Sequence, residues 1–196
     1  ALRDFAIGHP NLVTAQSYHS YSQLFMSPYG YTGTLPADNA TFVQMDADCA
    51  ALIYAIHGMS YAYGPIYSTI YPAAGNTVDW MYDHEGIFSF TTELRDTGTY
   101  GFQLPPAQII PTCEENFPAA LYLANWSTSP IKFSFPAGFP TRLDPGTPFP
   151  MQLRIMVVGG TLDPNSPALY ARIGSSGAFT SYALTPQGGG LFQATL

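Results

Sequence analysis

The sequence predicts a mixed-sheet α/β domain over residues 1–127, followed by a small β-rich module over residues 128–196. Helical and strand-like hydrophobic patterns alternate along the first part, which is typical of α/β domains. In the second part, short strand patterns recur with turn signals between them, as in a small Ig-like β-sandwich. Nine of the 18 prolines and nine of the 18 glycines also fall after residue 127, and this change in composition indicates the boundary.

The elements expected in the first part follow from hydrophobic spacing and from the residues that end each pattern. Apolar residues at helical spacing predict a long helix over 42–56, which Gly58 ends. The clearest strand is 87–94, because bulky Phe88 and Phe90 alternate with small or polar residues on the other face. The remaining expectations are the end of a helix at 1–8, a strand at 12–18, loops at 25–36 and 61–71, a short helix at 77–82 and a closing helix at 115–126.

The second part contains several short apolar runs separated by glycine, proline and serine. These runs predict strands rather than helices because they are short and are bounded by turn residues. The candidates are 131–135, 151–158, 168–173, 179–184 and 191–196. The last pattern reaches the end of the chain, so we expect that this module lacks its final strands.

Composition indicates a folded globular chain and excludes some classes of partner. Of the 196 residues, 46% are apolar and only 10% are charged, which favours a large buried interior over disorder. Lys132 is the only lysine and the arginines are scattered, so no basic surface is available to neutralise phosphates. A net charge of −7 disfavours anionic membrane surfaces, and no apolar run approaches the length of a membrane span. We therefore expect neither nucleic-acid nor membrane partners.

The cysteines and the first residue bear on the compartment. Cys49 and Cys113 are too few for a disulfide framework. Because the chain opens with Ala1 rather than methionine, we expect an upstream segment and an extracellular or cell-envelope location.

Two polar side chains stand near the ends of strand-like runs. His19 follows the run at 12–18, and Glu93 lies near the end of the run at 87–94. Ligands of open α/β sheets bind at the carboxyl ends of strands, so both residues are candidates for one crevice. A neutral imidazole is a good zinc ligand, and a nearby carboxylate is suited to proton transfer. Without further evidence, each residue also has a non-catalytic interpretation. His19 can be an ordinary histidine whose hydrogen bonds are satisfied within the protein, and Glu93 can be a solvated surface glutamate.

Four blocks of sequence resemble the zinc metallocarboxypeptidases of the carboxypeptidase A type. They are HSYSQL at 19–24, IYPAAG at 70–75, VDW at 78–80 and TELRDTGTYGF at 92–102. The resemblance covers about residues 1–126 and corresponds to the C-terminal half of that family's catalytic domain. It implies a carboxypeptidase-like α/β fold, a Zn²⁺ cofactor and the C-termini of peptides or proteins as substrates.

The resemblance also implies roles for individual residues. His19 matches the third zinc ligand, and Glu93 matches the general base and acid that activates the attacking water. Tyr71 matches a mobile tyrosine that closes over the terminal residue of the substrate. Ser20 and Tyr21 match positions that contact the substrate peptide on the non-prime side.

Specificity in this family is set by the pocket that receives the C-terminal side chain. Val78 matches the floor position, where an acidic residue would select lysine or arginine. The other matching wall positions are Met26, Ile66, Ala73 and Thr91. These residues predict an uncharged pocket that prefers apolar terminal side chains. Asn76 departs from the usual glycine and is expected to narrow or polarise the pocket.

The family's first two zinc ligands come from a His-x-x-Glu motif upstream of the third, and the 196 residues contain no such motif. The four histidines, at positions 9, 19, 57 and 84, are each followed three residues later by a residue other than glutamate. We therefore expect this chain to be inactive by itself. It is interpreted as a fragment or as a processed piece that associates with its N-terminal half. The alternative is a non-catalytic remnant with a binding, adhesive or self-assembling role.

A partial sheet would expose an apolar strand edge, which proteins normally cover. The sequence therefore also predicts association of this chain with a second copy or with the missing half.

Overall fold

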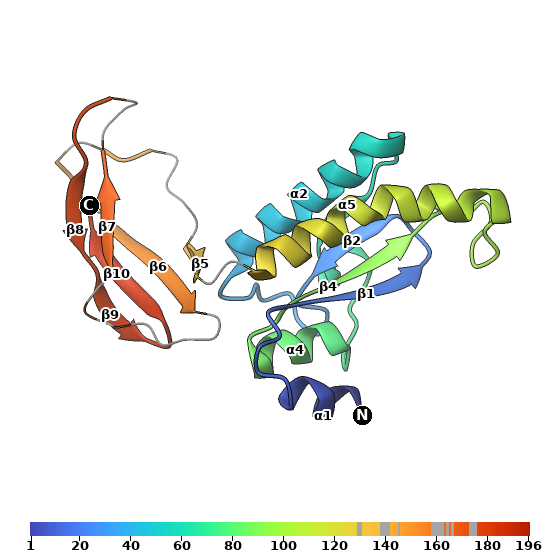
Figure 1. The fold of residues 1–196 in the computed structure, drawn as a ribbon, viewed down its shortest axis with the longest axis horizontal. Helices are drawn as coiled ribbons and strands as arrows, with labels where there is room; N and C mark the ends of the chain where they lie inside the picture. The colour runs from blue at the N-terminus through green and yellow to red at the C-terminus, as the bar shows by residue number, and fades with distance from the viewer. Residues whose placement is uncertain are drawn as a thin grey trace. The chain divides into compact units, whose positions relative to one another are not determined.

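The computed structural model describes residues 1–128, 131–137, 142–144, 146–157, 163, 165, 167–172 and 176–196 (Figure 1). The chain forms two compact units, Ala1–Ser129 and Pro130–Leu196, and each is described by itself. No helix within the described ranges is long and apolar enough to cross a membrane. Cys49 is buried, Cys113 is exposed, and both are free thiols.

The first unit is an α/β layer structure built on a four-stranded mixed sheet in the order β1-β4-β2-β3. Strand β4 pairs in parallel with β1 and antiparallel with β2, and β2 pairs in parallel with β3. Figure 1 shows α2 and α5 on one face of the sheet, with α4 and α1 on the other. The elements are α1 (Leu2–Ile7), β1 (Thr14–Ser20), β2 (Leu24–Ser27), α2 (Asn39–His57), β3 (Ala62–Pro65), α3 (Ile66–Thr69), α4 (Thr77–Glu85), β4 (Phe88–Leu94), η1 (Pro106–Gln108) and α5 (Ile109–Thr128).

The predicted mixed-sheet α/β class is confirmed, and the core lies where the alternation in β4 indicated. Phe88 and Phe90 are buried toward α2, where Phe42 stacks on Phe88 with ring centroids 4.8 Å apart. Ser89 faces the opposite side and donates a hydrogen bond to the carbonyl oxygen of Val78 in α4 at 2.6 Å. One face of β4 is therefore aromatic core, and the other is small and polar.

Two expected loops were wrong in part, because each contains a strand of the sheet. Strand β2 begins one residue before the expected loop at 25–36 and includes its first three residues, and β3 lies within 61–71. Each strand has only four residues, and β2 is buried throughout, so neither shows the alternation by which longer strands are recognised. Helix α5 begins at Ile109 rather than at the expected residue 115. Pro111 does not prevent this earlier start, because it lies in the first turn of the helix, where proline is tolerated.

A buried carboxyl group connects β2 to α2. Ser27 Oγ donates to Asp46 Oδ2 at 2.7 Å, and Asp46 Oδ1 is buried with no hydrogen-bond partner within the described ranges. Burial raises the pKa of Asp46 from 3.8 to about 8, against the smaller lowering effect of the Ser27 hydroxyl. The folded chain therefore holds a proton on Asp46 that the unfolded chain releases at lower pH.

Replacing Asp46 with asparagine is expected to flatten the pH dependence of stability between about pH 4 and pH 8. In this window the unfolded chain binds fewer protons at Asp46, so stability of the unmodified protein falls as pH rises, by up to about 1.4 kcal/mol per unit. Asparagine keeps an acceptor for Ser27 and does not ionise, so the variant should be the more stable protein at pH 8. Urea unfolding at several pH values measures the difference, and parallel profiles would show that Asp46 is ionised in the folded protein.

The described residues of the second unit form two antiparallel sheets. One has four strands in the order β5-β6-β10-β9, and the other pairs β7 with β8. The bounds are β5 (Ile131–Ser134), β6 (Pro150–Val157), β7 (Ala168–Ala171), β8 (Thr180–Ala183), β9 (Thr185–Gly188) and β10 (Leu191–Thr195). The expected strand ends at 158 and 173 lie outside the described residues. The Ig-like arrangement remains a prediction.

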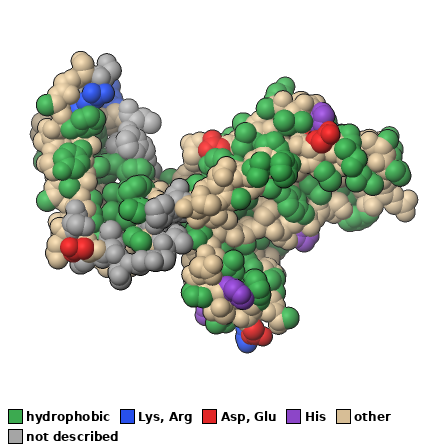
Figure 2. Space-filling model, viewed as in Figure 1, with side chains coloured by type: hydrophobic (Ala, Val, Ile, Leu, Met, Phe, Trp, Pro, Cys, Tyr) green, Lys and Arg blue, Asp and Glu red, His purple; other side chains and the backbone are tan. Residues whose placement is uncertain are grey.

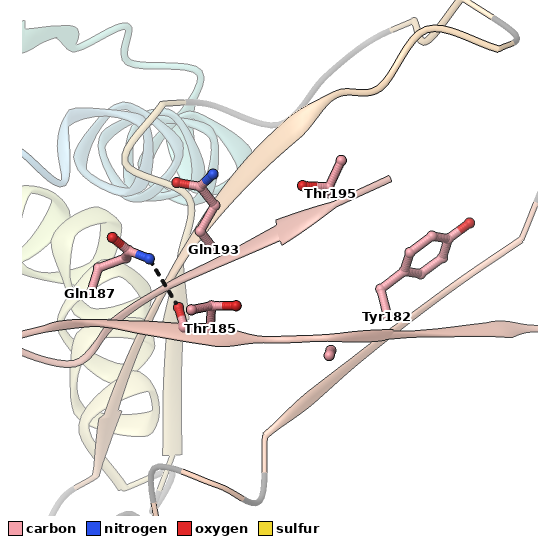
Figure 3. Close-up of a pocket in the computed structure, with 6 residues that line it drawn as sticks. Tyr182, Thr185, Gln187, Gln193 and Thr195 are labelled. Atoms are coloured by element: carbon pink, nitrogen blue, oxygen red, sulfur yellow. Dashed lines mark hydrogen bonds between the residues drawn. The ribbon is translucent and has the colours of Figure 1, made fainter.

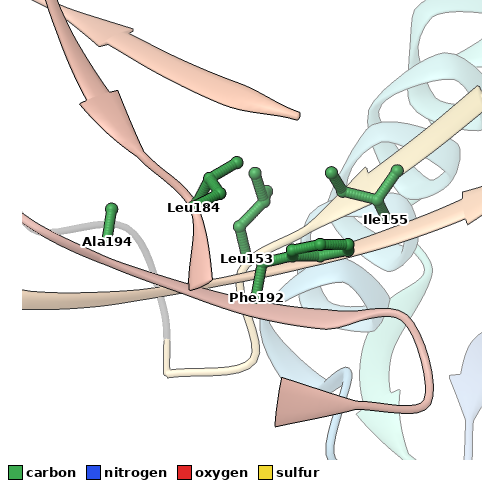
Figure 4. Close-up of a cluster of buried hydrophobic side chains, with 5 residues drawn as sticks. All are labelled: Leu153, Ile155, Leu184, Phe192 and Ala194. Atoms are coloured by element: carbon green, nitrogen blue, oxygen red, sulfur yellow. The ribbon is translucent and has the colours of Figure 1, made fainter. Parts of the chain in front are cut away.

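The core of the second unit is a small apolar cluster with residues from β6 and β10 (Figure 4). Its buried members are Leu153, Ile155, Leu184, Phe192 and Ala194. Phe192 and Ala194 alternate with Gln193 and Thr195 along β10, so one face of this strand is apolar and the other is polar.

Candidate active site

His19 and Glu93 lie directly opposite one another on neighbouring parallel strands. The register of β1 against β4 pairs His19 with Glu93 and, two residues earlier on each strand, Ser17 with Thr91. Paired residues of adjacent strands project on the same face, so both side chains lie on the small and polar face of β4. On the other side of β4, Leu24 of β2 pairs with Glu93. The sheet therefore brings the two predicted chemical residues together.

The carboxyl group of Glu93 is partly buried and has an oxygen without a partner. Within the described ranges, Glu93 Oε2 is buried and accepts no hydrogen bond. Burial raises the pKa of Glu93, and the nearby His19 lowers it by a smaller amount. This arrangement favours a carboxylate that accepts a proton near neutral pH more readily than a solvated glutamate does.

The imidazole of His19 is exposed, and its Nε2 lies 2.8 Å from Ser17 Oγ. Immediately after β1, the backbone N–H groups of Ser22 and Gln23 both donate to the carbonyl oxygen of Leu94 at 3.1 Å. These bonds attach the turn that follows His19 to the end of β4, one residue beyond Glu93. The His19–Glu93 pair is thus held both by strand register and by the following turn.

The other predicted substrate contacts lie in different surroundings. Ser20 is exposed at the end of β1, and Tyr71 is 61% exposed after α3. Tyr21 is partly buried and packs edge-on against Phe102, with ring centroids 5.0 Å apart. Tyr71 is therefore accessible at the surface, whereas Tyr21 is packed against a neighbouring ring.

The loop after β4 is organised by Asp96. Its carboxylate accepts hydrogen bonds from the backbone N–H groups of Tyr100 at 2.9 Å and Gly101 at 3.0 Å. Desolvation acts to raise the pKa of Asp96, but its backbone hydrogen bonds together outweigh that effect and lower it. A Cβ on Gly101 would lie 3.3 Å from the ring of Tyr21, so the loop packs closely on that tyrosine. Asp96 therefore fixes the loop that packs on Tyr21, two residues after His19.

A buried ion pair that was not expected from the sequence fixes the end of β4 to α5. Arg95 Nε donates to Glu115 Oε1 at 2.9 Å, and Arg95 Nη2 forms a second, short bond to Glu115 Oε2. Tyr61 also donates to Glu115 Oε1 at 2.9 Å, and Asn116 Nδ2 donates to the Tyr61 hydroxyl at 3.2 Å. Glu115 is fully buried and Arg95 is 8% exposed. In the sequence, Arg95 and Glu115 are charged residues beside apolar ones, and this pattern does not show that they pair with each other.

The residues expected to recognise the terminal side chain of a substrate are close together. Met26, Ile66 and Val78 are buried in one apolar cluster with Leu24, and Ala73 and Ile70 pack against it. Thr91 of β4 pairs with Met26 of β2 and lies two residues from Glu93. The five predicted pocket residues thus come from β2, β4, α3, α4 and the segment between the two helices.

Asn76 has a structural role beside this cluster. Its side chain accepts from the backbone N–H of Asp79 at 2.8 Å and donates to Asp79 Oδ2 at 2.7 Å and to the Ala73 carbonyl at 2.8 Å. Asp79 in turn accepts from the backbone N–H of Gly30 at 2.9 Å. A Cβ on Gly30 would lie 2.7 Å from both the Ala73 oxygen and Asn76 Nδ2, so this approach requires glycine.

The described residues alone do not fit a catalytic zinc ion. Such a site usually has three protein ligands, and no group of three or more histidine, cysteine, aspartate or glutamate side chains lies together within the described ranges. His19 is one suitable ligand, and Glu93 is beside it.

Comparison with known proteins identifies the family. The profile of the zinc carboxypeptidase family matches residues 1–119. Carboxypeptidase A1 of Rattus norvegicus is 47% identical over 118 residues, which are 60% of this chain and 28% of the relative. Carboxypeptidase B of Bos taurus is 43% identical over 127 residues, which are 64% of this chain and 30% of the relative.

A solved structure agrees. Bovine thrombin-activatable fibrinolysis inhibitor, solved in complex with tick carboxypeptidase inhibitor, aligns with a TM-score of 0.61 and 32% identity over 64% of this chain and 43% of that one. The matched part of the chain spans less than a third of the length of carboxypeptidase A1 and of carboxypeptidase B. The family match, the mixed sheet and the carboxypeptidase-like fold agree, and the chain belongs to the zinc carboxypeptidase family, peptidase family M14.

Proposed function

We propose that residues 1–127 form the C-terminal half of the catalytic domain of a zinc-dependent metallocarboxypeptidase, and that residues 128–196 form an accessory module. The proposed reaction is hydrolysis of the last peptide bond of a peptide or protein. The observation that carries this proposal is the pairing of His19 with Glu93 across β1 and β4, with a buried Glu93 oxygen that has no partner in the described part of the chain.

Glu93 is the proposed general base and, later, the general acid. Its carboxylate takes a proton from the attacking water and returns it to the leaving amine. A pKa raised by burial brings a carboxylate nearer to the operating pH, where proton transfer in both directions is efficient. His19 is the proposed zinc ligand from this chain, with the remaining ligands outside it. Zinc, when bound, would polarise the scissile carbonyl and make water more acidic.

The apolar cluster supports a preference for apolar C-terminal residues. Val78, at the proposed floor, carries no charge to attract lysine or arginine, and its neighbours Met26 and Ile66 are also apolar. Burying a substrate methylene against such residues contributes about 0.8 kcal/mol. Exposed Tyr71 is the proposed closing residue, and Ser20 and Tyr21 are the proposed contacts to the preceding part of the peptide.

The proposal is tested on the longest native form of the protein. Zinc content should be about one per molecule, and His19→Ala should lower zinc affinity by about 10-fold or more, because one of three ligands is lost. Release of C-terminal phenylalanine or leucine should exceed release of lysine from matched peptides. His84→Ala is the matched control, because His84 is exposed on α4 and stacks on Trp80. A zinc-free native protein, or equal zinc affinity in both variants, would refute the proposed metal role.

We also propose that the first unit associates with another chain along β1. This strand is at one edge of the sheet, and Tyr18 is 47% exposed on it. Edge strands offer unpaired backbone groups to a further strand. Hydrophobic side chains also lie at the surface over α2 and α5 (Figure 2). The proposed partner is a second copy of this chain or the missing N-terminal half. Separately, we propose an extracellular or cell-envelope location for the protein.

A further inference from the structure

The second unit contains a hollow of about 380 Å³ that the peptidase proposal does not use (Figure 3). Its size falls within the usual range of small-molecule sites. It is an open hollow lined by residues of β8, β9 and β10. The lining residues are Tyr182, Ala183, Thr185, Gln187, Gln193 and Thr195.

The strand register explains why polar side chains gather here. Gln193 of β10 pairs with Thr185 of β9, so these two side chains lie on one face. Thr195 lies two residues beyond Gln193 and shares that face, whereas the intervening Ala194 is buried in the core. Tyr182 of β8 packs against the same core and is thereby held in place. The lining is therefore attached to a packed layer rather than to a free loop.

The lining is uncharged and rich in groups that both donate and accept hydrogen bonds. Among the described residues it contains no acidic or basic side chain, and it offers two amides, two hydroxyls and one phenol. Gln187 Nε2 donates to the backbone carbonyl of Thr185 at 3.5 Å. Across the described ranges, the side chains of Tyr182, Gln193 and Thr195 make no hydrogen bond within the protein. Most of these hydrogen-bond donors and acceptors are therefore available to a ligand.

This chemistry narrows the class of ligand. Proteins usually hold phosphates and carboxylates with arginine, lysine or helix N-termini, and the lining has none of these. A wholly apolar ligand would leave the amides and hydroxyls without partners, which is unfavourable. A neutral ligand with many hydroxyl groups would satisfy them, and the ring of Tyr182 would offer it a flat apolar surface. We propose that this hollow binds a neutral oligosaccharide.

Calorimetric titration of the 196-residue chain with cellohexaose, xylohexaose and hexa-N-acetylchitohexaose tests this proposal. At least one of these neutral sugars should bind at millimolar concentration or below. Gln193→Ala should weaken its binding by about 10-fold, since it removes hydrogen bonds to the ligand. Gln193→Glu keeps the shape but loses the amide donors, and it should also bind more weakly.

Thr180→Ala is the matched control, because Thr180 is exposed on β8 and does not line the hollow. It should bind like the unmodified chain, and urea unfolding should confirm that each variant folds. A heparin hexasaccharide and an uncharged decapeptide serve as competing ligands. The proposal is overturned if no neutral sugar binds, if the Gln193 variants bind equally well, or if either competing ligand binds more tightly.

Discussion

Replacing Glu93 with glutamine is expected to lower the kcat of the longest native form by about 10³-fold, with little change in KM. General acid–base catalysis by a positioned side chain contributes about 10²- to 10⁴-fold, and an amide can neither take nor return the proton. In the unmodified enzyme, activity should rise with pH as Glu93 ionises, with the acid limb above the usual glutamate value of 4.5 because burial raises its pKa. Steady-state hydrolysis of a peptide ending in phenylalanine, measured across pH, tests both expectations.

The matched control for this variant is Glu85→Gln. Glu85 is also partly buried, but it ends α4 just before β4 begins, whereas Glu93 lies near the far end of that strand. Its replacement should leave kcat unchanged. Glu93→Gln should be at least as stable as the unmodified protein at pH 7, because the amide removes a partly buried charge with an unpartnered oxygen. A Glu93→Gln enzyme with substantial activity would show that another group transfers the proton.

The candidate pair was predictable because local pattern and family resemblance indicated the same two residues. Alternation along 87–94 placed Glu93 on the small, polar face with Ser89 and Thr91, and this agrees with the observed strand. Sequence alone did not establish that His19 lies directly opposite Glu93. That contact depends on the register of two strands separated by 67 or more residues, and register is a property of the assembled sheet.

The least predictable features were short strands and buried polar pairs. Strands β2 and β3 lack alternation, and their pairing with the rest of the sheet defines them. Ser27 and Asp46 are 19 residues apart, and Arg95 and Glu115 are 20 residues apart. The hydrogen-bond partner of each buried carboxyl group can therefore be identified only in the folded chain. In the second unit, the apolar run at 191–196 predicted the last strand, but not the neighbouring strands that line the hollow with it.

The second large effect is expected at Glu115, because it compensates the charge that secures the end of β4. Glu115→Gln should lower the free energy of unfolding by about 3–5 kcal/mol, since it leaves the buried Arg95 guanidinium without its counter-charge. Glu114→Gln is the matched control on the same helix. Glu114 is 56% exposed and contacts only His57, at 3.1 Å, among the ion pairs of the described residues. A surface pair of this kind contributes about 0–1 kcal/mol, so the control should unfold close to the unmodified protein in urea.

A double variant separates the lost counter-charge from lost packing. If the cost of Glu115→Gln is that of an uncompensated charge, then Arg95→Met combined with Glu115→Leu should recover part of the stability, because no charge remains buried. Recovery should be incomplete, because the Tyr61 hydroxyl loses its acceptor. A double variant as unstable as Glu115→Gln would instead mean that the hydrogen bonds of Arg95 and Tyr61 to Glu115, rather than its charge, stabilise this end of the sheet.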